Sequence, residues 1–267
     1  PISTLDNLRR QRHMCIRDRR YTRLDSRGID LNRDVLEKKA PESRLLQEVL
    51  LSFDPDYCFN MHDQRTIFSV GSPPQTATLS FLAPSEDEGR TLTSGRIKTM
   101  ELIASIYDSL KHVLEGRVGR YTDEFYPAAT GDNFQRMGYS TVLIESGHFP
   151  GDYQRQETRK FTFLALLSGL LSISQGVDSD YKTYFEIPNN EKRYLDAIVK
   201  NATIGSEKGD IGVFYKEKLV DNEVRFIPSL ERFEDLSGFN SDKIILGDHL
   251  VFPSQEEAEK WLLIEFI

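Results

Sequence analysis

Two short apolar runs in this chain each end in an ionisable residue, and a long loop follows each of them. Residues 57–61 (YCFNM) lead into His62, and residues 139–144 (YSTVLI) lead into Glu145. Apolar runs of this length, bounded by polar and turn residues, indicate buried strands. Since open α/β sheets bind ligands outside the carboxyl ends of their strands, we expect His62 and Glu145 to share one crevice.

The order of helix and strand patterns predicts an α/β fold with a mixed, mostly parallel sheet flanked by helices. We interpret residues 1–20 as a non-native segment, residues 21–185 as a partial catalytic domain and residues 186–267 as a small C-terminal α/β module. Helices are expected at residues 41–53, 94–114, 154–174, 191–200 and 254–264, long loops at residues 69–90 and 116–138, and a linker at residues 175–190. In the first helix, Leu45, Leu46, Val49 and Leu50 should form the buried stripe.

Charge and composition exclude several functional classes. The net charge of the 267 residues is −8, and an acidic body argues against a general nucleic-acid-binding protein, which usually needs a basic face. The longest apolar run, residues 161–174, is too short to cross a bilayer, so no membrane span is expected. The two cysteines, Cys15 and Cys58, form no disulfide framework and imply no redox compartment.

A polar segment at residues 20–34 (RYTRLDSRGIDLNRD) contains Arg23, Asn32 and Arg33. An amide next to a planar guanidinium can bind a carboxylate through charge-assisted, bidentate hydrogen bonds. The alternative is that this segment is a solvated, charged turn.

Four segments together resemble the carboxypeptidase A-like zinc metallopeptidases. GIDLNRD (residues 28–34) is similar to their Gly-Val-Asp-Leu-Asn-Arg signature, and FNMHDQ (residues 59–64) is similar to the strand end with their last zinc-binding histidine. YPAATGDNF (residues 126–134) resembles their substrate loop, and YSTVLIESG (residues 139–147) resembles the strand with their catalytic glutamate. The segments occur in the family's order, and the resemblance covers residues 21–174.

The resemblance implies a substrate site for a peptide with a free C-terminal carboxylate. Asn32 and Arg33 would hold that carboxylate, and Tyr126 would be the mobile tyrosine that closes over the substrate. Asp132 falls near the family's pocket-floor position, where a carboxylate would favour a basic C-terminal residue.

The resemblance also implies metal-assisted hydrolysis. His62 would be the third zinc ligand, Glu145 the general base that takes a proton from the zinc-bound water, and Arg23 the cation that stabilises the oxyanion. Zinc in carboxypeptidase A, which is itself the standard example of such a site, is held by two His and one Glu.

The other two ligands of the family come from a His-x-x-Glu motif, and none of the five histidines here is followed by Glu three residues later. We therefore expect these ligands upstream of Pro1, and no peptidase activity from the chain as written, since zinc affinity depends on a closed ligand set. His148 is expected to be a loop residue near the mouth of the crevice. Two alternatives remain: a zinc amidase or deacylase acting on cell-wall peptides or N-acyl amino acids, and a metal-free protein that binds peptide C-termini.

Overall fold

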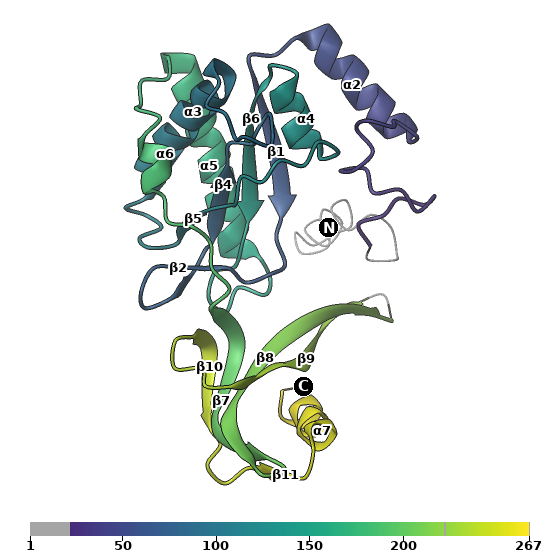
Figure 1. Cartoon of the computed structure of the whole chain (residues 1–267), viewed down its shortest axis with the longest axis vertical. Coiled ribbons are helices and arrows are strands. Elements are labelled where there is room, and N and C mark those ends of the chain that lie inside the picture. Colours follow the sequence, from purple (N-terminus) through teal and green to yellow (C-terminus); the bar gives the residue numbers. More distant parts are fainter. Residues whose placement is uncertain (1–21, 222, 267) are drawn as a thin grey trace, which may run out of the picture.

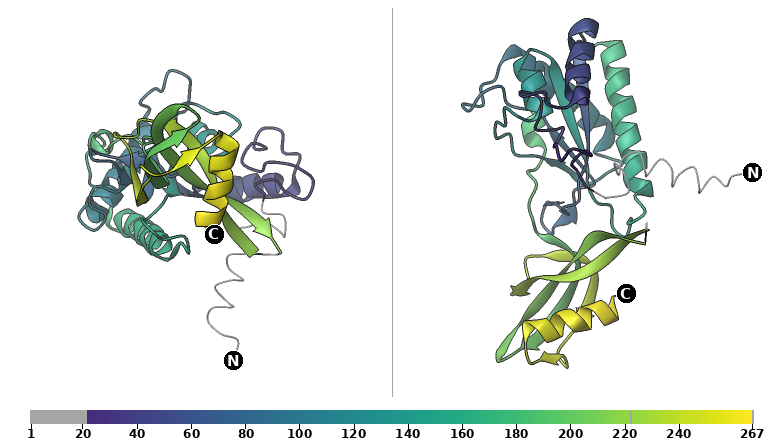
Figure 2. Two further views of the ribbon diagram at one scale, coloured as in Figure 1. Left: turned by 90° about the horizontal axis from the view of Figure 1, so that it is seen from below. Right: turned by 90° about the vertical axis from the view of Figure 1, so that its right-hand side faces the viewer.

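The structure, a computed structural model, describes residues 22–221 and 223–266. These residues form two bodies stacked along the longest axis of the molecule (Figure 1), and the right-hand view of Figure 2 also shows the two bodies apart. The segment 1–20, which we interpreted as non-native, lies outside the described residues.

The described residues contain helices and strands in both bodies. The helices are α2 (Pro41–Phe53), α3 (Ser94–Leu110), α4 (Thr130–Arg136), α5 (Gln156–Gln175), α6 (Thr183–Glu186) and α7 (Gln255–Glu265). The strands of the first body are β1 (Tyr57–Asp63), β2 (Ser69–Val70), β3 (Gln75–Thr76), β4 (Leu79–Leu82), β5 (Val118–Arg120) and β6 (Ser140–Ser146). The strands of the second body are β7 (Tyr194–Ile204), β8 (Glu207–Val220), β9 (Glu223–Glu234), β10 (Asn240–Leu246) and β11 (Val251–Phe252).

The first body is built on a four-stranded sheet with the order β1-β6-β4-β5. Strands β1 and β6 are parallel, as are β4 and β5, while β4 runs antiparallel to β6. The fold is therefore a mixed α/β fold, which confirms the general class that the alternating helix and strand patterns predicted.

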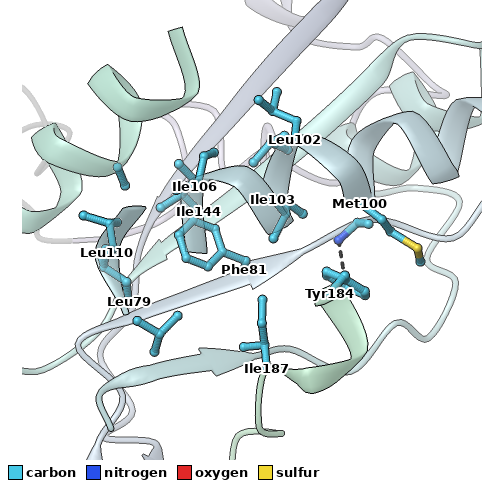
Figure 3. Close-up of a cluster of buried hydrophobic side chains, with 14 of the residues drawn as sticks. Leu79, Phe81, Met100, Leu102, Ile103, Ile106, Leu110, Ile144, Tyr184 and Ile187 are labelled. Atoms are coloured by element: carbon cyan, nitrogen blue, oxygen red, sulfur yellow. Dashed lines mark hydrogen bonds between the residues drawn. The ribbon is translucent and has the colours of Figure 1, made fainter. Parts of the chain in front are cut away.

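A single large core lies between this sheet and helices α3, α5 and α6 (Figure 3). Phe81 and Ile144 project into it from β4 and β6, and Met100, Ile103 and Ile106 meet them from α3; none of these side chains is exposed. The other face of the sheet carries α4 and a smaller cluster of Val35, Leu50 and Phe134. The helices thus cover the two faces of the sheet unequally. The face with the smaller cluster has more room for a binding site.

The predicted buried stripe of α2 is wrong for three of its four residues. Leu50 is buried in the smaller cluster, but Leu45, Leu46 and Val49 are each about half exposed. In Figure 1, α2 lies at the β1 edge of the sheet, and among the described residues the smaller cluster takes only Leu50 from this helix. Amphipathic spacing predicts the helix itself correctly, and does not tell whether a partner covers the whole stripe.

The expected linker at residues 175–190 is part of the first body instead. It contains α6, and Tyr184 and Ile187 are almost fully buried in the main core. The Tyr184 hydroxyl also accepts a hydrogen bond from the Ala83 N–H at 3.2 Å. The wrong prediction arose because most residues around Tyr184 and Ile187 are polar, which gives residues 175–190 the composition of a linker.

Three further expectations about secondary structure are wrong. The expected loop at residues 116–138 contains strand β5 and helix α4. Residues 191–200, expected to be helical, contribute to strand β7, and the expected loop at residues 69–90 contains strand β4 in the middle of the sheet. Strand β4 has only four residues, LSFL, all of them buried. A run this short carries too little periodicity to be separated from the Pro- and Ser-rich sequence around it.

The second body, which we call the C-terminal module (residues 194–266), is a sheet with the order β10-β7-β8-β9, with β11 paired to β7. Helix α7 packs on this sheet through Ala258 and Leu262. The Ser254 hydroxyl accepts a hydrogen bond from the Glu257 N–H, as the capping pattern predicted. Of the helices that the structure describes, none is long and apolar enough to cross a membrane.

The burial of Tyr184 can be tested by stability measurements. Tyr184→Ala should lower the free energy of unfolding by about 3–5 kcal/mol, since it leaves a cavity in the main core. Phe185→Ala is a matched control, because that neighbouring ring is 45% exposed and its removal should cost about 1 kcal/mol. Urea denaturation measures both, and equal effects of the two substitutions would show that residues 175–190 are a linker after all.

Candidate functional site

His62 and Glu145 are paired residues on neighbouring parallel strands. In the register of β1 and β6, the Cα of His62 stands opposite that of Glu145. Because side chains alternate between the faces of a sheet, both residues lie on one face, and Met61 and Ile144 lie on the other. This is also the face with α4, the one that carries the smaller cluster. On the far side of Glu145, strand β4 places Ser80 in register with it.

Glu145 sits in an environment that favours its protonated form. Burial, and then the negative charge of Asp63, raise its pKa from 4.5 to about 7. A carboxyl group with such a pKa exchanges protons readily near neutral pH, which is the property of a general base or acid.

His62 is held in its neutral form. Burial lowers the pKa of the imidazole, and the positive charges of Arg33 and Arg23 lower it further. A neutral imidazole has a free nitrogen lone pair, which can accept a proton or bind a metal ion. Both arginines thus act on His62 through their positive charge.

Asn32 joins the polar segment to the start of α4. Its Oδ1 atom accepts a hydrogen bond from the Thr130 N–H at 3.2 Å. Asn32, His62 and Thr130 line one pocket with a volume of about 250 Å³, together with Asn60 of β1. Two of the residues predicted for the site, Asn32 and His62, are therefore brought together across 30 residues of sequence.

The two arginines differ in their position around this pocket. The Arg33 side chain donates a hydrogen bond to the Asn32 carbonyl at 2.8 Å and is exposed. Arg23 forms an ion pair with Asp30 at 2.8 Å, and 64% of its side chain is exposed. Neither arginine lines the pocket itself, so both act on it as nearby positive charges.

Tyr126 and Asp132 belong to the segment that leads into α4. Asp132 is buried, and its Oδ1 atom accepts the Tyr126 N–H at 3.0 Å. Burial raises the pKa of Asp132, while the charges of Arg33 and Arg96 act in the opposite direction. Tyr126 is 53% exposed, and its hydroxyl donates to Glu124 at 3.0 Å. Asp132 thus holds the backbone of this segment, and its contact with a substrate side chain stays a prediction.

Zinc does not fit the described residues on their own. Within residues 22–221 and 223–266, no three His, Cys, Asp or Glu side chains are grouped in a way that could hold a metal ion. His62 is the single family ligand among them, and one imidazole gives far too small a ligand set for zinc.

Three residues around His62 and Glu145 were missed from the sequence. Asn60 lines the pocket, and its position two residues before His62 on a strand could have placed it on the same face. Burial raises the pKa of Tyr121, and the negative charge of Glu145 raises it further. Asp63 affects Glu145 in the same way. Neither Tyr121 nor Asp63 stands in a pattern that would have revealed this.

The chain matches none of the protein-family models, none of the curated proteins and none of the solved structures with which it was compared.

The raised pKa of Glu145 predicts a pH-dependent stability. In the folded chain the carboxyl binds its proton more tightly than at its ordinary pKa of 4.5. Its contribution to stability is therefore fully present below about pH 4.5 and is lost as the pH rises through about 7. Between about pH 4.5 and pH 8, the free energy of unfolding should fall by on the order of 3 kcal/mol more in the wild type than in Glu145→Gln. Urea denaturation at a series of pH values measures this difference, and parallel curves for the two proteins would contradict it.

Proposed function

We propose that the crevice at the carboxyl ends of β1 and β6 is the substrate-binding and general-base part of a zinc metallocarboxypeptidase-type site. One observation carries the proposal: His62 and Glu145 are register partners on the same face of the sheet, and Asn32 lines a pocket with His62. The substrate would be a peptide with a free C-terminal carboxylate.

The polar segment supplies suitable groups for that carboxylate. The Oδ1 atom of Asn32 is bonded to the Thr130 N–H, so the remaining polar group of its amide is the NH₂ donor. The Arg33 guanidinium beside it is exposed and offers paired N–H donors that match the two oxygens of a carboxylate. A donor amide and a guanidinium on consecutive residues would bind a carboxylate more strongly than a neutral amide.

Glu145 provides the proton transfers that amide hydrolysis requires. With a pKa of about 7, the carboxylate can take a proton from an attacking water as the new carbon–oxygen bond forms. The same proton can then pass to the amine nitrogen as the carbon–nitrogen bond breaks. Such a positioned base contributes typically ~10²–10⁴-fold to a rate. The nearby charge of Arg23 would stabilise the oxyanion formed between the two steps.

Recognition of the carboxylate can be tested by binding. N-benzoyl-glycyl-arginine should bind the chain about tenfold or more tightly than its C-terminal amide, because a charge-assisted hydrogen-bond pair is lost in the amide. Arg33→Ala should remove this preference, and Arg33→Lys should keep part of it, since an ammonium retains the charge without the paired donors. Isothermal titration calorimetry with the acid and the amide on each of the three proteins measures all six affinities.

The control for this experiment is Arg136→Ala, which removes an exposed arginine from the last turn of α4 and should leave the preference unchanged. Equal binding of the acid and the amide by the wild type would contradict the proposal. Tighter binding of an N-acyl amino acid such as N-acetylarginine than of the dipeptide would favour the deacylase alternative.

Hydrolysis requires more than the described residues supply. Because His62 is their single zinc ligand of the family type, we expect the 267-residue chain to bind the dipeptide without cleaving it, even with added zinc. Release of arginine, followed by chromatography, is the measurement. Cleavage that a chelator abolishes and that Glu145→Gln also abolishes would overturn this expectation.

A further inference from the structure

The loop that follows Glu145 is tied to the C-terminal module by two carboxylates. His148 donates a hydrogen bond to Asp242 of β10 at 2.9 Å, and the Gly151 N–H donates to the same oxygen at 2.9 Å. The Tyr153 hydroxyl donates to Asp196 of β7 at 2.6 Å. His148 is therefore a buried interface residue. The expectation that this loop residue lies near the mouth of the crevice is wrong. The loop after β6 rests on the module through three polar contacts.

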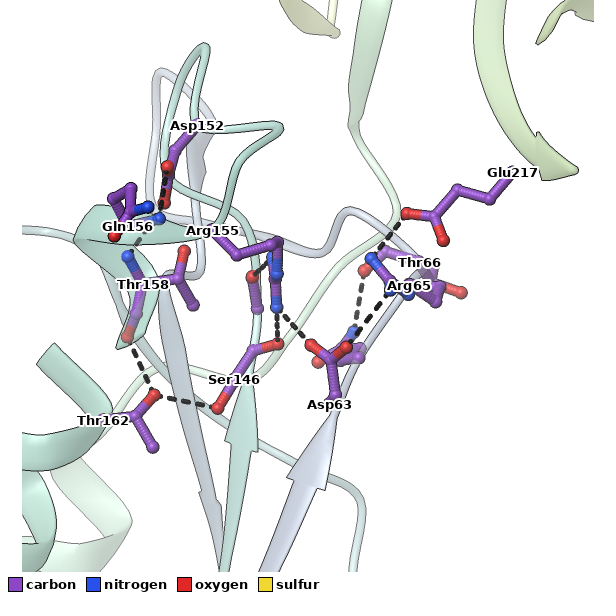
Figure 4. A network of polar contacts seen from close by, with 12 residues as sticks. Asp63, Arg65, Thr66, Ser146, Asp152, Arg155, Gln156, Thr158, Thr162 and Glu217 are labelled. Carbon is purple, nitrogen blue, oxygen red and sulfur yellow. Dashed lines mark hydrogen bonds and ion pairs between the residues drawn. The ribbon is translucent and has the colours of Figure 1, made fainter. Parts of the chain in front are cut away.

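A buried arginine joins the ends of the two site strands. Arg155 forms an ion pair with Asp63, the residue after His62, and hydrogen bonds with the carbonyls of Ser146 and Gly147, directly after Glu145 (Figure 4). Its bond to the Ser146 carbonyl measures 2.7 Å. The guanidinium is thus a bridge between the carboxyl end of β1 and the carboxyl end of β6.

A second arginine extends this bridge to the module. Arg65 lies 3.3 Å from Asp63 and forms an ion pair of 2.5 Å with Glu217 of β8. Figure 4 shows Arg65 between these two carboxylates. The Glu217 side chain is 12% exposed and the Arg65 side chain 43% exposed, so the carboxylate of this pair is shielded from water while its guanidinium is partly solvated. We call Glu217, Arg65, Asp63 and Arg155 the bridging chain.

We propose that the C-terminal module is a positioning element for the crevice, which acts through the bridging chain to hold the carboxyl ends of β1 and β6 in place and so sets the position of His62 relative to Glu145. The four members of the bridging chain are positioning residues, because they act on the site through its two strand ends. This proposal deepens the proposed function, and it rests on His62 and Glu145 forming one site.

The energetics support a role in positioning. Exposed ion pairs add little to stability, since solvent screens them. A buried guanidinium with three acceptors, in contrast, keeps those acceptors in one geometry, because each would lose a partner if the strands moved. Breaking the bridging chain at its module end should therefore loosen the strand ends more than it lowers the overall stability.

The test is backbone amide hydrogen exchange, read by NMR, on the full chain with Glu217→Gln. Exchange at His62, Asp63, Glu145 and Ser146 should become about threefold to tenfold faster, and the ring signals of His62 should shift. Exchange in the main core, at Phe81 and Ile103, should stay as in the wild type. The matched control is Glu234→Gln, which breaks the exposed pair with Arg232 on β9 and should change none of these signals.

Glu217→Asp keeps the charge on a shorter side chain and should show a smaller loosening at the same four amides. It also replaces Glu217→Gln if that variant does not fold. Unchanged exchange and unchanged His62 ring signals, or an equal acceleration across the main core, would overturn the proposal. No peptide is used, so this result and the outcome of the binding experiment are independent of each other.

Discussion

The parallel pairing of β1 with β6 is the interaction on which the site depends. It sets His62 opposite Glu145 at neighbouring strand ends, on the one face of the sheet that the large core does not occupy. A shift of one residue in this register would place one of the two side chains among the apolar residues that face α3 and α5. The apolar contacts of Val142 and Ile144 in that core therefore protect the geometry of the crevice as well as the stability of the fold.

The same pairing explains the electrostatics of the crevice. Strand ends lie at the boundary between the core and water, where charged groups are only partly desolvated. Burial accordingly shifts the pKa of His62 downward and that of Glu145 upward, and each shift favours the neutral form of the group. The arginines of the polar segment stay exposed at this boundary, where they keep their hydration and can exchange it for a carboxylate.

Much of the first body could be predicted from the sequence, because two of its strands are apolar runs that each end in an ionisable residue. The runs before His62 and Glu145 are long and apolar enough to be identified as strands. In the C-terminal module, the cap at Ser254 marks α7 correctly. The predictions that were wrong have a common cause. The burial of Tyr184, the short strand β4 and the exposure of Leu45 all depend on contacts between distant segments, which local periodicity does not contain. The contact of His148 with Asp242 joins residues 94 positions apart, so no local pattern could indicate it.

The central claim is that Arg33, His62 and Glu145 serve one bound peptide. A crystal structure of the chain with N-benzoyl-glycyl-arginine tests it most directly. We predict that the peptide carboxylate lies about 3 Å from the guanidinium of Arg33 and that the amide bond lies between His62 and Glu145. A peptide bound elsewhere, or His62 and Glu145 on opposite faces of the sheet, would contradict the claim.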